Sequence, residues 1–309
     1  MTYFVYKKMA KQYIDSLPSL KRSEQTEQNY TSILDGFGEY LKSNQAEVSP
    51  ATAEAWRVEM FKTVKINTIR HYMTVLCKFF DYCVLLNCLE QNPMRIIDKP
   101  SHERTEFNNL LTREEIEKLI TEQPKGMNKK TACRNRAIVI LLLQSGLRSD
   151  ELRELKLCDL DFENGVINVE HGKGDKRRQV PFPRLARETV TAYLKSGIRP
   201  NRATDSELLF GTDADENGHG SSGIWKKMSS AGLNTMIKRY VKNITGKEIH
   251  THLLRHAAAS LWDDMGIEMR TIQNALGHAS LRTTETVYVS LLNKHKAANT
   301  INAAFDGGF

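Results

Sequence analysis

The segment that decides the fold begins with His252-Leu253-Leu254-Arg255-His256, continues through Leu276-Gly277-His278 and ends at Tyr288. The first histidine and the arginine of this segment are spaced i, i+3, so on a helix they face the same way. The glycine before His278 predicts a helix end that leaves the second imidazole at a junction between helices. Two histidines, one arginine and one tyrosine could therefore be directed at a single phosphate group.

A zinc site is the first alternative, because His252 and His256 have the i, i+4 spacing seen in zinc-binding helices. The glutamate of a His-Glu-x-x-His motif is absent, and Arg255 between the two histidines would repel a cation. We therefore exclude a metal here. We predict instead that His256 is a buried structural histidine whose ring is hydrogen-bonded.

Arg148 lies upstream, in Ser145-Gly146-Leu147-Arg148-Ser149-Asp150-Glu151-Leu152. An arginine after a helix-ending glycine is most often a solvated charge, yet its planar fork can give a phosphate two parallel hydrogen bonds. Glu151 follows three residues later, where it could brace Arg148 or a nearby histidine. Ser149 is expected to cap the short helix that follows.

Gly172-Lys173-Gly174 stands between these two groups, and it is not a Walker A motif. By default such a tripeptide is a turn with a solvated lysine. A lysine at a hairpin tip can nevertheless reach into a groove and donate a proton to a leaving oxygen. Lys173 is therefore a candidate general acid.

Length and composition limit the class of protein. A chain of 309 residues is long for one compact core and suggests two domains. Its 40% hydrophobic and 26% charged residues are typical of soluble proteins, and no apolar run approaches the ~20 residues that cross a bilayer. Residues 1–15 do not resemble a signal peptide, so we expect the protein in the cytoplasm.

Cysteine usage and charge narrow the class further. The five cysteines are odd in number and form no Cys-x-x-Cys, which argues against a disulfide framework or zinc ribbon and for reduced thiols. A formal net charge of +7 and a pI near 9.0 favour a polyanionic partner such as nucleic acid.

Apolar periodicity predicts how the chain is divided. Residues 1–97 contain four stretches with helical spacing, which predict a small four-helix domain. The polar segment 98–107 contains a proline and is interpreted as a linker to a second domain over residues 108–309. In that domain Thr112 and Glu115 form a capping box, and the apolar helix 133–144 ends at a glycine.

A small sheet is expected next. Asn164-Gly165 is a strong hairpin signal, and the turn around Lys173 returns the chain, so a three-stranded antiparallel meander is predicted. Beyond Pro183 the chain is expected to be helical, apart from the Gly/Ser-rich loop 212–223. The expected fold class is therefore mainly α, with a mixed α/β second domain that carries this small sheet.

Taken in order, these motifs resemble the tyrosine recombinase (phage integrase) family over roughly residues 110–290. The family signature comprises Gly-Leu-Arg-x-x-Glu-Leu, a hairpin lysine, His-x-x-Arg, Leu-Gly-His and a tyrosine. Its residues here are Arg148, Lys173, His252, Arg255, His278 and Tyr288. By this resemblance residues 1–97 are a core-binding (SAM-like) DNA-binding domain and residues 108–309 are the catalytic domain. The chain is similar to the compact two-domain members of Xer-like size, which lack an arm-binding N-terminal domain.

The tyrosine context differs from one branch of the family. Tyr288 follows His278 by ten positions, where Xer-type members generally have nine, and Val-Ser follows it in place of the common Thr-His. These differences favour the recombinase of a mobile genetic element over an Xer-type enzyme that resolves chromosome or plasmid dimers. Phage integration is a further possible role.

The resemblance implies that Tyr288 attacks a DNA phosphodiester, forming a 3′-phosphotyrosyl link and leaving a 5′-hydroxyl. Tyrosine has an unperturbed pKa of ~10, so it needs help. Nearby arginines favour the phenolate, His252 could take the proton, and Lys173 would protonate the leaving oxygen.

The cationic residues have a second implied role. Arg148, Arg255 and His278 would stabilise the negative charge of the pentavalent transition state, with Glu151 as a supporting residue. The covalent link preserves the bond energy, so no ATP is expected. Because cationic side chains take the place of a metal ion, no metal or other cofactor is expected either.

The expected partner is double-stranded DNA with inverted-repeat core sites, held in a clamp of the two domains. Candidate DNA contacts lie near helix starts or in basic stretches, and each could equally be a solvated surface residue. They are Thr26, Asn29, Asn67, Thr68 and Arg70 in the first domain and Lys226, Lys227, Lys238 and Arg239 in the second.

The tail 290–309 could fold back on its own domain. The family suggests instead that it docks on a neighbouring protomer and links a homotetramer on paired sites.

Two other functions remain open. A type IB topoisomerase or a hairpin-forming telomere resolvase would use the same tyrosine chemistry. A DNA-binding regulatory protein could keep the fold with a decayed active site. The intact set from Arg148 to Tyr288 argues against decay, since a protein that only binds DNA has no need of a tyrosine there.

Overall fold

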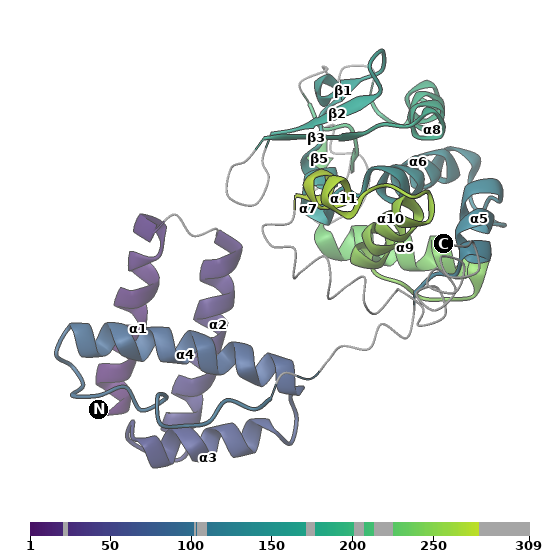
Figure 1. Cartoon of the computed structure of the whole chain (residues 1–309). Coiled ribbons are helices and arrows are strands. Elements are labelled where there is room, and N and C mark those ends of the chain that lie inside the picture. Colours follow the sequence, from purple (N-terminus) through teal and green to yellow (C-terminus); the bar gives the residue numbers. More distant parts are fainter. Residues whose placement is uncertain are drawn as a thin grey trace, which may run out of the picture. The chain divides into compact units, whose positions relative to one another are not determined.

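The computed structural model describes residues 1–20, 24–101, 103, 110–170, 177–200, 207–212 and 225–277. The chain divides into two compact units, Met1–Thr105 and Glu106–Phe309 (Figure 1). Each unit has its own hydrophobic core. Within the described ranges, no helix is both long enough and apolar enough to cross a membrane.

The first unit is a bundle of helices. They are α1 (Tyr3–Ser16), the 3-10 turn η1 (Pro18–Leu20), α2 (Glu24–Ser43), α3 (Pro50–Met60) and α4 (Ile66–Leu85). Helix α4 packs against α1 and α2, and α3 packs against α2 (Figure 1). At the centre the rings of Tyr6, Phe37 and Phe80 contact one another, and the Tyr6 hydroxyl donates to the carbonyl of Leu34 at 2.7 Å. Aromatic packing with a satisfied hydroxyl thus joins α1, α2 and α4.

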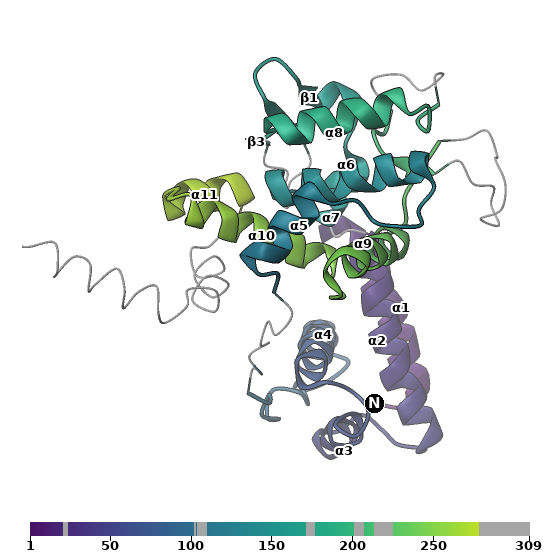
Figure 2. The same ribbon diagram turned by 90° about the vertical axis from the view of Figure 1, so that its right-hand side faces the viewer.

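The second unit is built around one central helix, α6. Its elements are α5 (Arg113–Thr121), α6 (Lys129–Ser145), α7 (Ser149–Glu154), η2 (Leu157–Asp159), β1 (Leu160–Asp161), β2 (Val166–Val169), β3 (Arg178–Pro181), α8 (Arg184–Lys195), β4 (Gly211–Thr212), β5 (Lys226–Lys227), α9 (Ser230–Thr245), α10 (Thr251–Asp264) and α11 (Met269–Leu276). In both views α6 lies between α8 on one side and α9 and α10 on the other (Figure 1 and Figure 2). Residues 137–143 of α6 are fully buried, so this stretch has no polar face and forms the axis of the core.

The predicted sheet is present. Strands β1, β2 and β3 are antiparallel in that order, with Leu160 opposite Ile167 and Ile167 opposite Val180. The turn between β1 and β2 contains Gly165 at φ +68°, whose N–H donates to the carbonyl of Asp161 at 3.0 Å. The predicted fold class, mainly helical with a small three-stranded antiparallel sheet, is confirmed.

Two local predictions are wrong. Strand β4 pairs with β5, where the sequence predicts only helices and a loop. Strands of two residues carry no alternating pattern to detect, and the pairing depends on Gly211, where an added Cβ would lie 2.6 Å from Cε2 of the Trp225 ring. The N-cap of α7 is Arg148 and not Ser149, which begins the helix and is buried. The carboxylate of Glu151, the third residue of the helix, accepts the N–H of Arg148, which places Arg148 at the N-cap position.

Helix α6 ends at Gly146, which has φ +63°. A Cβ at this position would lie 2.8 Å from Cδ2 of Leu276 and 3.1 Å from Cη2 of Trp262. Both side chains belong to a small apolar cluster formed by α10 and α11. Glycine is therefore required here for two reasons: the left-handed backbone, and the close approach of the α10–α11 pair.

Gly146→Ala is expected to lower the free energy of unfolding by about 2–4 kcal/mol, because about 1 kcal/mol of left-handed strain adds to about 1–3 kcal/mol of overpacking. Gly246→Ala is the matched control. Gly246 ends α9 at φ +77°, and no described atom lies within 4 Å of its added Cβ, so only the strain of about 1 kcal/mol should remain. Urea unfolding measures both losses. Equal losses would contradict the packing role of Gly146.

Candidate active site

The first part of the site is the turn between α6 and α7. The N–H of Arg148 lies 2.8 Å from Oε2 of Glu151, and Nη1 of Arg148 lies 2.7 Å from Oε1 of the same carboxylate. Glu151 is 7% exposed, whereas 24% of the Arg148 side chain is exposed. The buried carboxylate therefore orients a guanidinium that solvent, and hence a ligand, can reach.

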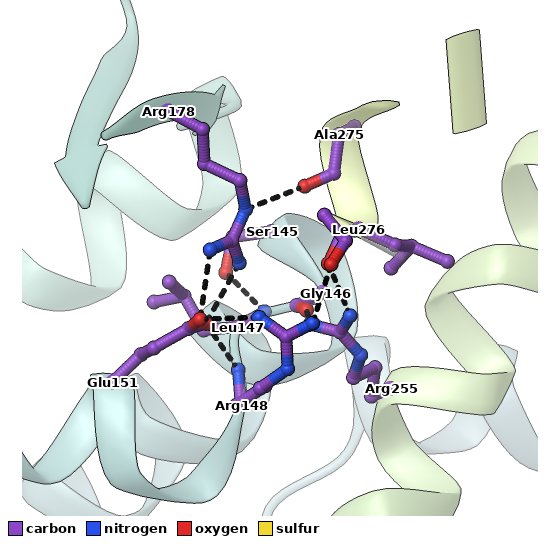
Figure 3. Close-up of polar contacts among 10 residues, drawn as sticks. Ser145, Gly146, Leu147, Arg148, Glu151, Arg178, Arg255, Ala275 and Leu276 are labelled. Atoms are coloured by element: carbon purple, nitrogen blue, oxygen red, sulfur yellow. Dashed lines mark hydrogen bonds and ion pairs between the residues drawn. The ribbon is translucent and has the colours of Figure 1, made fainter. Parts of the chain in front are cut away.

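A second arginine, absent from the candidates above, binds the same carboxylate. Nη1 and Nη2 of Arg178 each lie 2.7 Å from a different oxygen of Glu151, in a bidentate fork (Figure 3). Nε of Arg178 donates to the carbonyl of Ala275 at 3.0 Å. The sequence does carry a signal for this residue. Arg178 shares a face of β3 with the buried Val180, and an arginine on the core side of a strand needs a partner.

Arg255 is the most buried of these arginines, with 5% of its surface exposed. Its Nη1 donates to the carbonyl of Gly146 and its Nη2 to the carbonyl of Leu276. Burial, and then the positive charge of Arg148, lower the pKa of Arg255 to about 9. The side chain thus keeps its charge at neutral pH while it joins the end of α6 to the end of α11.

The three arginines meet at the carboxyl end of α11 (Figure 3). Three consecutive carbonyls each accept from a different one: Ala275 from Arg178, Leu276 from Arg255, and Gly277 from Arg148 at 2.6 Å. The last carbonyls of a helix have no partner within the helix and carry the negative end of its dipole, so cations are favoured there. These bonds fix the backbone up to Gly277, the residue directly before His278 in the sequence.

The charges of the site leave a positive excess. Burial by itself raises the pKa of Glu151, but hydrogen bonds from Arg178 and Arg148 and the charge of Arg178 outweigh it and lower the pKa to about 2. The carboxylate is therefore ionised at neutral pH and offsets only one of the three guanidinium charges. The remaining positive charge suits an anionic group such as a phosphate.

The two histidines of α10 have different environments. His252 is exposed, but partial desolvation by the surrounding protein, followed by the charge of Arg255, lowers its pKa, so at neutral pH its ring is neutral and can accept a proton. His256 is half-buried, which corrects the prediction of a buried side chain. It lies at the edge of the buried stripe that contains Leu254 and Ala257. Burial, and then the charges of His252 and Arg255, lower the pKa of His256 to about 4.

The other catalytic candidates, Lys173, His278 and Tyr288, lie outside the described residues, as does the tail 290–309. The structure thus brings together Arg148, Glu151 and Arg255 from the predicted set and places His252 on the same helix as Arg255.

The candidate DNA contacts of the first unit lie on two helices. Thr26 and Asn29 belong to α2, and the Asn29 amide nitrogen lies 3.1 Å from Nε2 of His71 on α4. Thr68 lies in the first turn of α4. Two further candidates on α4 contact backbone: Asn67 donates to the carbonyl of Glu103 at 2.9 Å, and Arg70 donates to that of Pro100.

The candidate contacts of the second unit lie on β5 and α9. Lys226 and Lys227 form β5, and Lys227 makes an ion pair with Glu154 of α7. Lys238 is half-buried and Arg239 is exposed, both on α9. The pair with Glu154 attaches β5 to the helix that Arg148 caps.

Comparisons with known proteins agree with the motifs. A family model described as Phage integrase family matches residues 109–295. Tyrosine recombinase XerC of Thermodesulfovibrio yellowstonii is 32% identical over 279 residues, covering 88% of this chain and 88% of that one. Tyrosine recombinase XerA of Pyrococcus furiosus is 37% identical over 185 residues, covering 60% of this chain and 58% of that one.

Solved structures share the fold. The XerH site-specific recombinase bound to a palindromic difH substrate is 23% identical, with a TM-score of 0.70, and the match covers 91% of this chain and 80% of that one. The Tn1549 transposon integrase in complex with circular intermediate DNA is 20% identical, with a TM-score of 0.68 and coverage of 97% and 99%.

The family model covers more than half of the chain, and the XerC relative aligns with most of it. The resemblance that the motifs indicate is therefore confirmed. The chain belongs to the phage integrase family and is a tyrosine site-specific recombinase.

Proposed function

We propose that this recombinase cleaves and rejoins DNA through a covalent 3′-phosphotyrosyl link to Tyr288. The observation that carries the proposal is a pair of guanidiniums, Arg148 and Arg255, bound to the carboxyl end of α11 directly before His278. Two fixed cations with directed N–H donors are what a reacting phosphodiester requires.

In the proposed step one bond to phosphorus replaces another. The Tyr288 oxygen forms a bond to phosphorus while the bond from phosphorus to the 5′ oxygen breaks. His252, whose lowered pKa keeps its ring neutral, takes the phenol proton, and Lys173 gives a proton to the leaving 5′ oxygen. The 5′-hydroxyl of a second strand then reverses the step on a new partner, so no ATP is consumed.

The positive residues act on the transition state. Arg148, Arg255 and His278 stabilise the extra negative charge on the pentavalent phosphorus. Arg255 is held in place by two carbonyls before the substrate arrives, so it does not have to reorganise during the reaction. Glu151 supports Arg148 through its two hydrogen bonds.

We propose that residues 1–97 form a core-binding domain that holds duplex DNA, joined by the linker 98–107 to a catalytic domain over 108–309. Asn67 and Arg70 bind backbone carbonyls near the end of the first unit, so their main role is to fix the start of the linker. The other polar and basic candidates remain as phosphate contacts. Assembly is a homotetramer on paired inverted-repeat sites in the cytoplasm, linked by the tails.

Two biological roles are compatible with this chemistry. The ten-residue step from His278 to Tyr288 favours a mobile-element recombinase. The 32% identity to an XerC over most of the chain supports resolution of chromosome or plasmid dimers as the second candidate. Recombination assays separate the two, because the first role requires the ends of an element and the second requires two copies of one site.

Tyr288→Phe is expected to abolish the covalent protein–DNA adduct while DNA binding is retained, because only the attacking oxygen is removed. The DNA that flanks the gene is searched for an imperfect inverted repeat, the substrate is a nicked duplex that carries this repeat, and the adduct is measured on a denaturing gel. Tyr40→Phe, in the first unit, is the control and should form the adduct normally. An adduct in Tyr288→Phe would show that another residue is the nucleophile.

Cleavage is expected to slow as the pH falls below about 6.5, with a midpoint under the unperturbed histidine value. Protonation of His252 at low pH removes its ability to accept the phenol proton. Because the pKa of His252 is lowered, this loss occurs below the ordinary histidine range. Single-turnover rates between pH 5 and 8 would test this, with His256→Gln as the matched control. His252→Gln should react slowly and lose the acid limb. An acid limb that persists in His252→Gln assigns the base to another group.

A further inference from the structure

Arg178 is a buried arginine that the proposed chemistry does not use. Its side chain is 11% exposed, and all three of its nitrogens make hydrogen bonds within the protein. Two of these bonds go to Glu151 and one to the carbonyl of Ala275. Because both terminal nitrogens of Arg178 bind Glu151, Arg178 is not positioned to bind a phosphate. Any contribution to the reaction therefore acts through its neighbours.

Those neighbours belong to the segments that carry the active-site residues. Glu151 lies on α7 and orients Arg148, and Ala275 lies in the last turn of α11, three residues before His278. Arg178 itself begins β3, and Lys173 precedes it by five positions in the sequence. One side chain therefore links three separate segments of the proposed active site.

The packing around Arg178 leaves little freedom. Gly277 has φ +62°, and a Cβ added there would lie 3.0 Å from both Cδ and Nε of Arg178. The carbonyl of the same glycine accepts from Arg148. The backbone at Gly277 thus lies close to Arg178 and is hydrogen-bonded to Arg148.

The charges give Arg178 a second effect. Glu151 is buried and ionised, and without another counter-charge it would hold Arg148 more strongly and offset the charge that a phosphate has to meet. Arg178 takes both carboxylate oxygens in a bidentate fork. Arg148 can then be braced by Glu151 and still present its positive charge outward.

We propose that Arg178 is a positioning residue for DNA cleavage, which fixes the Glu151 carboxylate that aims Arg148 and fixes the end of α11 that leads to His278. The inference rests on the proposed role of Arg148. It adds an element that the recombinase signature motifs above do not contain, and it requires no contact between Arg178 and DNA.

The test compares Arg178→Gln, Arg178→Lys and the control Arg184→Gln, whose residue is 87% exposed and pairs with Glu188 on the surface of α8. Single-turnover cleavage of the nicked duplex is measured at saturating protein, and DNA affinity is measured by fluorescence anisotropy. Arg178→Gln should cleave about 10–100-fold more slowly, the cost of a small misplacement of reacting groups, with affinity changed by less than about 3-fold. Arg178→Lys keeps the charge but not the fork and should be intermediate. Arg184→Gln should match the wild type.

A double-mutant cycle tests the route through Glu151. If Arg178 acts through this carboxylate, the double variant Arg178→Gln/Glu151→Gln should cleave at a rate within about 3-fold of that of the slower single variant. Multiplied effects in the double variant would overturn the proposed route. A wild-type rate in Arg178→Gln, or a loss of affinity in proportion to the loss of rate, would overturn the proposal itself.

Folding and nucleophile controls separate the possible failures. Circular dichroism and urea unfolding show whether each variant is folded. If Arg178→Gln is unfolded, the cleavage rate of Arg178→Lys decides the question. A wild-type rate in Arg178→Lys would then overturn the proposal. Slow variants should still reach a full yield of adduct at long times. The failure of the proposed function would look different, because Tyr288→Phe would then form the adduct.

Discussion

The binding of three arginines to the carbonyls of Ala275, Leu276 and Gly277, at the carboxyl end of α11, is the interaction on which the catalytic region depends. Each arginine comes from a different element: Arg178 from β3, Arg255 from α10 and Arg148 from the cap of α7. A helix end offers several unpaired carbonyls and the negative pole of a dipole in one small volume. It can therefore gather cations that would otherwise repel one another.

The central helix makes this meeting possible. Residues 137–143 of α6 are fully buried, so the helix is held on all sides, and its end at Gly146 has a defined position. The carbonyl of Gly146 accepts from Arg255, and the absence of a side chain lets Leu276 and Trp262 approach. The same glycine thus ends α6, admits α11 and binds one of the proposed catalytic arginines.

Electrostatic strain in the site is partly compensated. Arg255 lies near two other guanidiniums, and the resulting lowering of its pKa to about 9 reflects burial first and the charge of Arg148 second. Glu151 and the carbonyl dipoles offset part of this repulsion, and a positive excess remains. The negative charge of a phosphodiester would offset a further part of this excess, so the fold is prepared for an anion in advance of binding.

Local signals in the sequence predict much of the structure. Helices over 3–16, 50–60 and 66–85 follow from apolar periodicity and caps, and the hairpin follows from Asn164-Gly165. The predicted capping box of Thr112 and Glu115 is present. Arg148 and Glu151 are also close in sequence, and the structure places them in contact.

Other features depend on residues that are far apart in the chain. Arg178 and Glu151 are separated by 27 positions, and Arg148 and Gly277 by 129. The backbone contacts of Asn67 and Arg70, and the pairing of β4 with β5, likewise have no signal in their neighbouring residues. Periodicity, caps and turns act over a few residues, so the sequence alone identifies the family, most elements and the proposed catalytic set. Which carbonyl each arginine binds depends on packing between distant segments, and only the folded chain determines that.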